Sequence, residues 1–331
     1  MRVQQDTLVL RGWLGQTSSV ALATRRSATI TITREARGRV SGDGIELAFG
    51  YWPGRGAAVV ALHGLTSTYV SFMGVAERLA GRRPLFALDV RGRGDSDKPD
   101  GPYGIAQHAR DVAQAMRALG IGPSVIVGHS MGAFIATALA ASEPELVAGL
   151  ILVDGGFAFP MNEAARKSFD SGLSNRIAQL QQTYPSRQAY RDFWRSQPQF
   201  PPEDWSPWIE AFLEYELGGE PPHLKPKASA EGVRVDLAEG LKTREINERF
   251  SAIRVPVILL RAEAGFIPGH PPLYPEPVIA EMRSHLAGLE VHTMQGTTHY
   301  NIVIGNRGAT ALADLIVEFA ERCKRSRGAP E

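Results

Sequence analysis

Short continuous apolar runs alternate along most of the chain with segments whose apolar residues recur at helical spacing. Continuous runs of four to eight apolar residues are typical of strands buried on both faces, and intervening helices indicate parallel strands. The fold class predicted is therefore α/β, with a doubly wound, mostly parallel sheet. The pattern predicts strands at 57–62, 84–90, 124–128, 147–153, 255–261 and 289–293, and helices near 70–80, 105–119, 133–141, 276–286 and 308–324.

Two stretches interrupt this alternation. Near the N-terminus, residues 28–33 alternate at period two and predict a strand, and residues 45–52 predict its pairing partner beyond a turn at 40–44. From Gly155 onward the chain becomes rich in aromatic residues and prolines and has no good strand. Helices are expected there near 163–182, 187–196, 205–217 and 241–250. We expect an N-terminal extension over 1–38, a core over 39–154 and 251–331, and a helical cap over 155–250.

The pentapeptide Gly128-His129-Ser130-Met131-Gly132 lies between the predicted strand at 124–128 and a helix of small residues. In the context strand, sharp turn, helix, a Gly-x-Ser-x-Gly sequence is typical of a nucleophile elbow. The glycines allow a strained turn and close packing of helix against strand. The free N–H groups at the N-terminus of the helix favour a developing oxyanion.

With three further motifs, this pentapeptide makes the chain resemble the α/β-hydrolases. The motifs are His63-Gly64, the loop from Asp89 to Ser96, and a late His299, and they occur in the order of that superfamily over roughly residues 45–322. The resemblance implies an α/β-hydrolase core with an inserted cap and a Ser…Asp/Glu…His triad. Serine at the elbow disfavours the haloalkane dehalogenase and epoxide hydrolase branches, whose nucleophile is an aspartate.

The resemblance implies Ser130 as the nucleophile and His299 as its base, because only this histidine lies in the loop before the last helix. The acid is less clear, since Gly265 occupies the position where many relatives carry an aspartate. Asp154, at the end of a predicted strand, is one candidate, and Glu263, in the usual loop, is the other. Asp154 could instead only cap the turn that follows it.

Further site residues follow from the same resemblance. The backbone N–H groups of Leu65 and Met131 are expected to form the oxyanion hole. His63 and Gly64 are expected beside the substrate, although a histidine at position 63 usually plays a structural part in this superfamily. Residues 268–272 are a candidate for the pocket rim. The aromatic residues of the insert that are candidates for lining an apolar substrate pocket are Phe157, Phe159, Trp194, Trp205 and Trp208.

Composition, charge and the absence of certain motifs argue against several classes of function. The formal net charge of +1 gives no argument for a nucleic-acid partner, and the chain lacks an apolar run long enough for a transmembrane helix. The single cysteine, Cys323, rules out an internal disulfide. Neither a nucleotide-binding glycine motif nor metal-ligand spacing occurs, so no cofactor and no metal are expected. We expect an intracellular protein acting on a small molecule, as a monomer or homodimer, without membrane insertion.

The function predicted is a serine hydrolase that cleaves a carboxylic ester or related acyl compound through an acyl-enzyme. A carbon–carbon bond hydrolase, a lactonase or a thioesterase would use the same triad and stays open. From a different class, a non-catalytic receptor or scaffold for a small ligand also stays open, because the usual triad acid is missing from its loop.

Overall fold

A ten-stranded sheet organises the described part of the chain. The computed structural model describes residues 9–11, 17–19, 35–159, 175 and 177–328. Six neighbouring strands are parallel, and the remaining four continue the sheet antiparallel. The strand order is β12 (Glu290–Met294), β11 (Val257–Ala262), β8 (Val147–Val153), β7 (Ser124–His129), β5 (Val59–Leu62), β6 (Leu85–Leu88), β4 (Glu46–Trp52), β3 (Ala36–Ser41), β1 (Val9–Arg11) and β2 (Thr17–Ser19).

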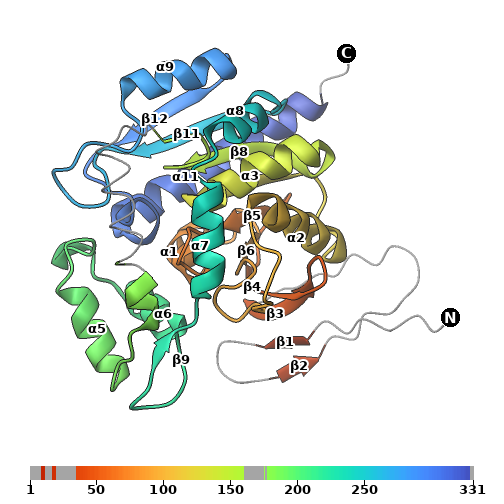
Figure 1. Cartoon of the computed structure of the whole chain (residues 1–331). Helices are drawn as coiled ribbons and strands as arrows, with labels where there is room; N and C mark the ends of the chain where they lie inside the picture. The colour runs from red at the N-terminus through yellow and green to blue at the C-terminus, as the bar shows by residue number, and fades with distance from the viewer. Residues whose placement is uncertain (1–8, 12–16, 20–34, 160–174, 176, 329–331) are drawn as a thin grey trace.

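Helices cover both faces of this sheet and bury one apolar core on each side (Figure 1). One face packs against α2 (Ile105–Ala118), α3 (Met131–Ser142), α8 (Thr243–Ser251) and α9 (Glu276–His285). The other packs against the 3₁₀ turn η1 (Tyr69–Phe72), α1 (Met73–Leu79), α10 (Asn301–Ile304) and α11 (Asn306–Gly328). The central strands are buried along their whole length, which explains their unbroken apolar runs. The predicted doubly wound, mostly parallel α/β fold is confirmed.

The insert, defined here as residues 155–250, contributes further helices between β8 and β11. The expected helices at 187–196, 205–217 and 241–250 are found as α5 (Arg187–Arg195), α6 (Pro207–Glu216) and α8. The expected helix at 163–182 lies mostly outside the described residues, of which 175 and 177–181 are helical. A helix that the pattern did not predict, α7 (Ala230–Glu239), follows α6, and the insert also holds a short strand pair, β9 (Leu217–Gly218) with β10 (Lys225–Pro226).

At the N-terminal side, β4 does not take its partner from the expected region. It pairs antiparallel with β3, whereas the strand expected at 28–33 lies outside the described residues. In β3 the buried residues Ala36 and Val40 have Gly38 between them, so the alternation of apolar and polar side chains is too weak to predict a strand. β3 also runs across the expected boundary at residue 38, and the division into extension, core and cap stays a prediction.

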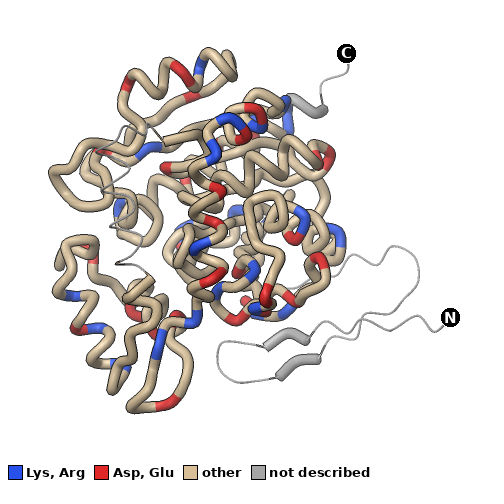
Figure 2. The backbone as a smooth tube through the Cα atoms, viewed as in Figure 1, with Lys and Arg blue, Asp and Glu red and all other residues tan. Residues whose placement is uncertain are grey.

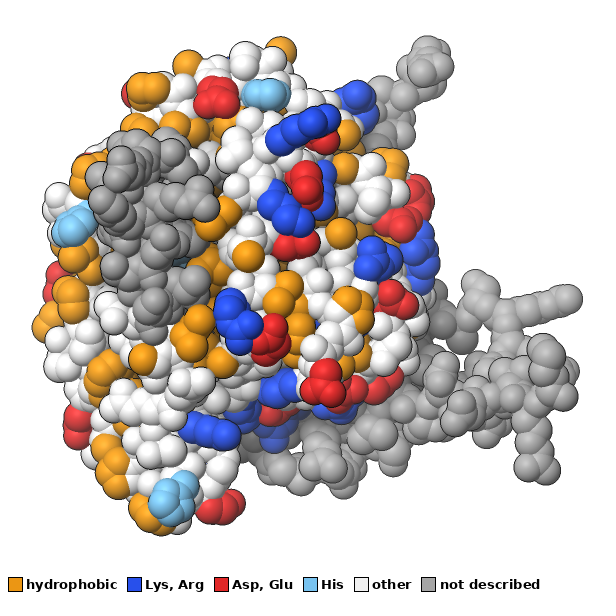
Figure 3. Space-filling view, viewed as in Figure 1, with side chains coloured by type: hydrophobic (Ala, Val, Ile, Leu, Met, Phe, Trp, Pro, Cys, Tyr) orange, Lys and Arg blue, Asp and Glu red, His pale blue; other side chains and the backbone are white. Residues whose placement is uncertain are grey.

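Lys, Arg, Asp and Glu residues are interspersed along the described chain (Figure 2). On the face drawn in space-filling form, acidic and basic side chains alternate with apolar ones (Figure 3). Within the described residues, no helix is both long and apolar enough to cross a membrane. The remaining 3₁₀ turns are η2 (Pro144–Leu146) and η3 (Pro202–Asp204).

Candidate active site

Ser130 occupies a strained turn between β7 and α3. Its φ of +53° lies in the left-handed region, which is uncommon for a residue with a side chain and which marks stored strain. The Ser130 N–H donates to the carbonyl of Val153 at 2.9 Å and ties the turn to β8. A Cβ atom at Gly128 would lie 2.3 Å from the carbonyl oxygen of Gly132, and one at Gly132 would lie 2.0 Å from that of Leu62. The two glycines of the motif are therefore required sterically.

His299 is paired with Asp154. Its Nδ1 lies 2.7 Å from Oδ2 of Asp154, which is fully buried at the end of β8. The other carboxylate oxygen, Oδ1, accepts from the backbone N–H of Ala262 at 3.3 Å. Asp154 has a φ of +47°, so its backbone is also strained where its carboxylate meets the imidazole. A carboxylate in this position can orient the ring and stabilise an imidazolium.

Glu263, the other candidate acid, is exposed and faces a different group. Its Oε2 accepts from the backbone N–H of Gly296 at 2.7 Å, at the beginning of the loop that carries His299. Glu263 therefore holds that loop from outside. The carboxylate in contact with the His299 ring is that of Asp154.

His129, inside the motif, also holds the histidine loop. Its Nε2 lies 2.8 Å from the backbone carbonyl oxygen of His299, to which it donates, and the two rings lie 4.8 Å apart. Burial lowers the pKa of His129 to about 3, so this ring is neutral at physiological pH. The motif analysis assigned no role to His129. Its position directly before the serine, at the carboxyl end of a parallel strand, was the available signal.

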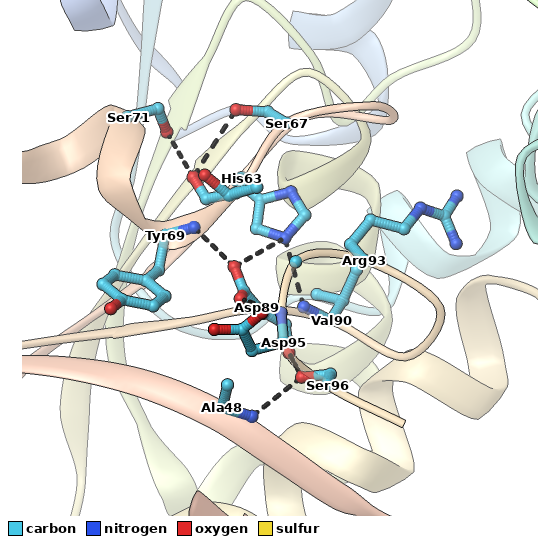
Figure 4. A network of polar contacts seen from close by, with 12 residues as sticks. Ala48, His63, Ser67, Tyr69, Ser71, Asp89, Val90, Arg93, Asp95 and Ser96 are labelled. Atoms are coloured by element: carbon cyan, nitrogen blue, oxygen red, sulfur yellow. Dashed lines mark hydrogen bonds and ion pairs between the residues drawn. The ribbon is translucent and has the colours of Figure 1, made fainter. Parts of the chain in front are cut away.

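The segment with the expected oxyanion donor Leu65 lies directly against Ser130. A Cβ atom at Gly64 would be 3.3 Å from Cβ of Ser130. His63 is fully buried: its Nδ1 donates to the Gly64 carbonyl at 2.7 Å and its Nε2 accepts from the Val90 N–H at 3.1 Å (Figure 4). Burial lowers the pKa of His63 to about 3. His63 thus fastens the loop, and it is absent from the described cavity wall.

A cavity of about 750 Å³ opens over this arrangement. Ser130, His299, Gly64, Leu65 and Met131 all contribute to its wall. The ring of Phe266 stands edge-on to His299, with 4.7 Å between ring centroids, and is 48% exposed. The described aromatic residues of the wall near the serine and under the insert include Phe134, Phe159, Trp194, Phe200, Phe212 and Phe266.

The expected pocket residues are only partly brought together. Trp194 and Phe159 line the cavity, and Pro272 of the expected rim does too. Three others lie elsewhere: Phe157 is fully buried against Phe250, Trp205 stacks with Arg195, and Trp208 stacks with Arg78. Composition alone does not reveal which face of an insert helix carries such a ring. Phe134 also lines the cavity, and the sequence analysis did not identify it. Its position four residues after Ser130, on the same side of α3, was the available signal.

Among the described residues, no group of three or more His, Cys, Asp or Glu side chains could hold a metal ion. The expectation of a cofactor-free mechanism stays a prediction.

Comparisons with known proteins support the fold. Residues 57–208 match a family model described as the alpha/beta hydrolase fold. The N-formylmaleamate deformylase of Pseudomonas putida is 35% identical over 148 residues, which are 44% of this chain and 54% of that protein. The 2-(acetamidomethylene)succinate hydrolase of Mesorhizobium japonicum is 38% identical over 101 residues, 30% of this chain and 36% of that protein. The aligned part of the chain thus spans about half or less of these relatives.

The structural similarity extends further along the chain. A crystal structure of E-2-(acetamidomethylene)succinate hydrolase superposes with a TM-score of 0.72 and 23% identity, covering 87% of this chain and 100% of that one. At this identity the superposition establishes a shared fold.

Proposed function

Because this chain belongs to the α/β-hydrolase superfamily, we propose that it is a serine hydrolase that cleaves a carboxylic ester or related acyl compound through an acyl-enzyme. One observation carries the proposal. The imidazole of His299 is held by the buried carboxylate of Asp154 and lines the same cavity as Ser130, which stands on a strained turn. Strain of this kind at a cavity is a feature of functional sites.

In the proposed mechanism, Oγ of Ser130 attacks the substrate carbonyl while His299 takes the hydroxyl proton at Nε2. Asp154 keeps the proton on Nδ1 and stabilises the imidazolium. The N–H groups of Leu65 and Met131 donate to the developing oxyanion. His299 then gives its proton to the leaving group, and water activated by the same ring releases the acyl group from Ser130.

The cavity supports a small substrate with an apolar or aromatic portion. Its wall combines aromatic rings with a few polar groups near the serine, which is typical of sites for one polar reacting centre on an apolar molecule. The curated relatives carry names that refer to formyl and acetamido compounds. An amide or thioester is therefore tested alongside an ester, and the lactonase and carbon–carbon bond hydrolase alternatives use the same residues. The proposal needs neither a cofactor nor a macromolecular partner.

Turnover of p-nitrophenyl acetate, butyrate and octanoate, together with labelling by a fluorophosphonate, tests the proposal. We expect the wild type to turn over at least one ester and to be labelled on Ser130, as located by peptide mass. In Ser130→Ala both signals should fall by roughly 10³-fold or more. Ser142→Ala is the matched control, because Ser142 lies at the far end of the same helix and its hydroxyl bonds only to the Ala138 carbonyl in the described contacts.

Two results would count against a serine hydrolase. One is wild-type turnover and labelling no higher than in Ser130→Ala across esters, an anilide and a thioester. The other is ester turnover that survives in Ser130→Ala. The first result, with ligand binding to the cavity still detectable by calorimetry, would favour the receptor alternative.

A further inference from the structure

Arg93 lies in the loop after β6, outside the proposed triad, yet its guanidinium reaches the oxyanion loop. Nε of Arg93 donates to the carbonyl of Leu65 at 2.9 Å, and Nη1 donates to the carbonyl of Arg91 at 3.0 Å. Nη2 is 3.9 Å from Sδ of Met131. Arg93 therefore contacts both residues whose N–H groups are the proposed oxyanion donors. Its side chain is completely buried, and it extends away from His63 and Asp89 (Figure 4).

The fourth contact of Arg93 comes from the insert. Oδ2 of Asp236, on helix α7, lies 2.5 Å from Nη2 of Arg93 and 2.9 Å from Nε2 of His108, with all three side chains fully buried. Burial alone would raise the pKa of Asp236, but the interactions with Arg93 and His108 outweigh burial and leave the pKa below its ordinary value. The carboxylate thus stays ionised and paired at neutral pH.

Helix α7 is fixed on the core at both ends. Before its first turn, the N–H of Ser229 donates to the carbonyl of Gly92 at 2.8 Å. At its last residue, Oε2 of Glu239 accepts from the N–H of Ile105 at 2.8 Å. Between these points, Oδ1 of Asp236 accepts from the N–H of Gly104 at 2.7 Å. Asp236 is therefore held in one place, and it holds Arg93 in turn.

We propose that Arg93 is a positioning residue for the oxyanion hole and that Asp236 of the insert fixes it there. The inference rests on the proposed serine hydrolase function. An oxyanion hole is effective when its donors are fixed before the charge develops. Arg93 donates to the carbonyl of Leu65, which belongs to the peptide group that follows the proposed Leu65 N–H donor. Arg93 also contacts the side chain of Met131, the other proposed donor residue. Docking of α7 thereby keeps both donors in place.

Arg93→Lys tests this role, because lysine keeps the charge opposite Asp236 but has no planar fork to bond Leu65 and Arg91 at the same time. We expect kcat for a p-nitrophenyl ester to fall about 10- to 100-fold with KM within about threefold, and fluorophosphonate labelling to slow in parallel, since misplacing a catalytic group by about 1 Å costs on the order of 10²-fold. Asp236→Asn, which keeps an acceptor for Gly104, should lose kcat in the same way.

Arg91→Lys is the matched control. Arg91 is also buried and pairs with a carboxylate, Asp111, at 2.7 Å, but its guanidinium points to the α2 side of the loop. Its replacement should lower the unfolding midpoint and leave kcat within about threefold of the wild type. All variants are compared at a temperature where circular dichroism shows them folded.

The outcomes separate this inference from the function on which it rests. If the wild type is neither active nor labelled, the proposed function fails and the inference fails with it. If the wild type is active and folded Arg93→Lys and Asp236→Asn keep its kcat and labelling rate, only the inference fails. An equal loss of kcat in Arg91→Lys would also overturn it, because the effect would then be a general weakening of the loop.

Discussion

Replacing Asp154 with asparagine separates its proposed role from that of Glu263. The carboxylate oxygen that faces Nδ1 of His299 at 2.7 Å is fully buried, so water cannot take its place. In Asp154→Asn the other oxygen position can still accept from the Ala262 N–H. The amide –NH₂ then faces Nδ1 and donates to it. The proton of the imidazole moves to Nε2, the atom that must accept the proton of Ser130.

The magnitude follows from this change of tautomer. A base that carries its proton on the wrong nitrogen cannot act, and the same substitution in the Ser-His-Asp triad of serine proteases lowers kcat about 10⁴-fold. That factor corresponds to about 5 kcal/mol of transition-state stabilisation. Glu263→Gln has a different expectation: the exposed glutamine keeps an oxygen for the Gly296 N–H, so kcat should stay within about threefold of the wild type.

Single-turnover acylation by a p-nitrophenyl ester measures both variants, and the unfolding midpoint in urea shows whether each is folded. Equal losses in the two variants, or a larger loss in Glu263→Gln, would refute the assignment. So would an Asp154→Asn enzyme that is folded and acylates within tenfold of the wild type.

Two further predictions concern the loops beside the site. Gly64→Val should lower kcat more than Leu65→Ala, because a Cβ at 64 would press on Ser130 at 3.3 Å while Leu65→Ala keeps the backbone N–H; similar rates in the two variants would argue against this loop as the oxyanion hole. Burial raises the pKa of Asp89 from 3.8 to about 6, so the native protein binds this proton more tightly than the unfolded chain. The resulting stabilisation is present below pH 4 and is lost as pH rises through 6. Relative to Asp89→Asn, the wild type should lose about 2 kcal/mol of unfolding free energy between pH 4 and 7 in urea titrations, and a pH-independent difference would contradict this.

The parallel core was predictable because its signals are local. Strands such as β5 and β7 are apolar on both faces and stand out as unbroken runs, and the glycines of the elbow are required by contacts within a few residues of the serine and by β5. The positions of Ser130 and His299 at the carboxyl ends of β7 and β12 follow from the order of the elements.

The choice of triad acid and the presence of helix α7 depend on contacts between residues that are distant in sequence. Asp154 and Glu263 each follow a strand, and only the folded loops show that one is buried against His299 and the other exposed. Helix α7 escaped prediction because it docks through polar contacts: of its ten residues, Gly232, Val233 and Asp236 are buried, so no apolar stripe marks it.

The loop after β6 explains how the insert can be oriented over the site. Three of its charged residues each meet a different part of the insert: Asp89 accepts from Oη of Tyr215 in α6 at 2.6 Å, Arg93 meets Asp236, and Asp95 lies 2.6 Å from Nζ of Lys227. Apolar contacts under α5 and α6 would tolerate a small shift of the insert. The buried Arg93–Asp236 pair would not, because a buried carboxylate separated from its partner loses several kcal/mol. The insert is therefore held in its orientation partly by this loop, whose Arg93 also bonds Leu65. Its placement over the cavity and the geometry of the proposed oxyanion hole are thus set by the same few residues.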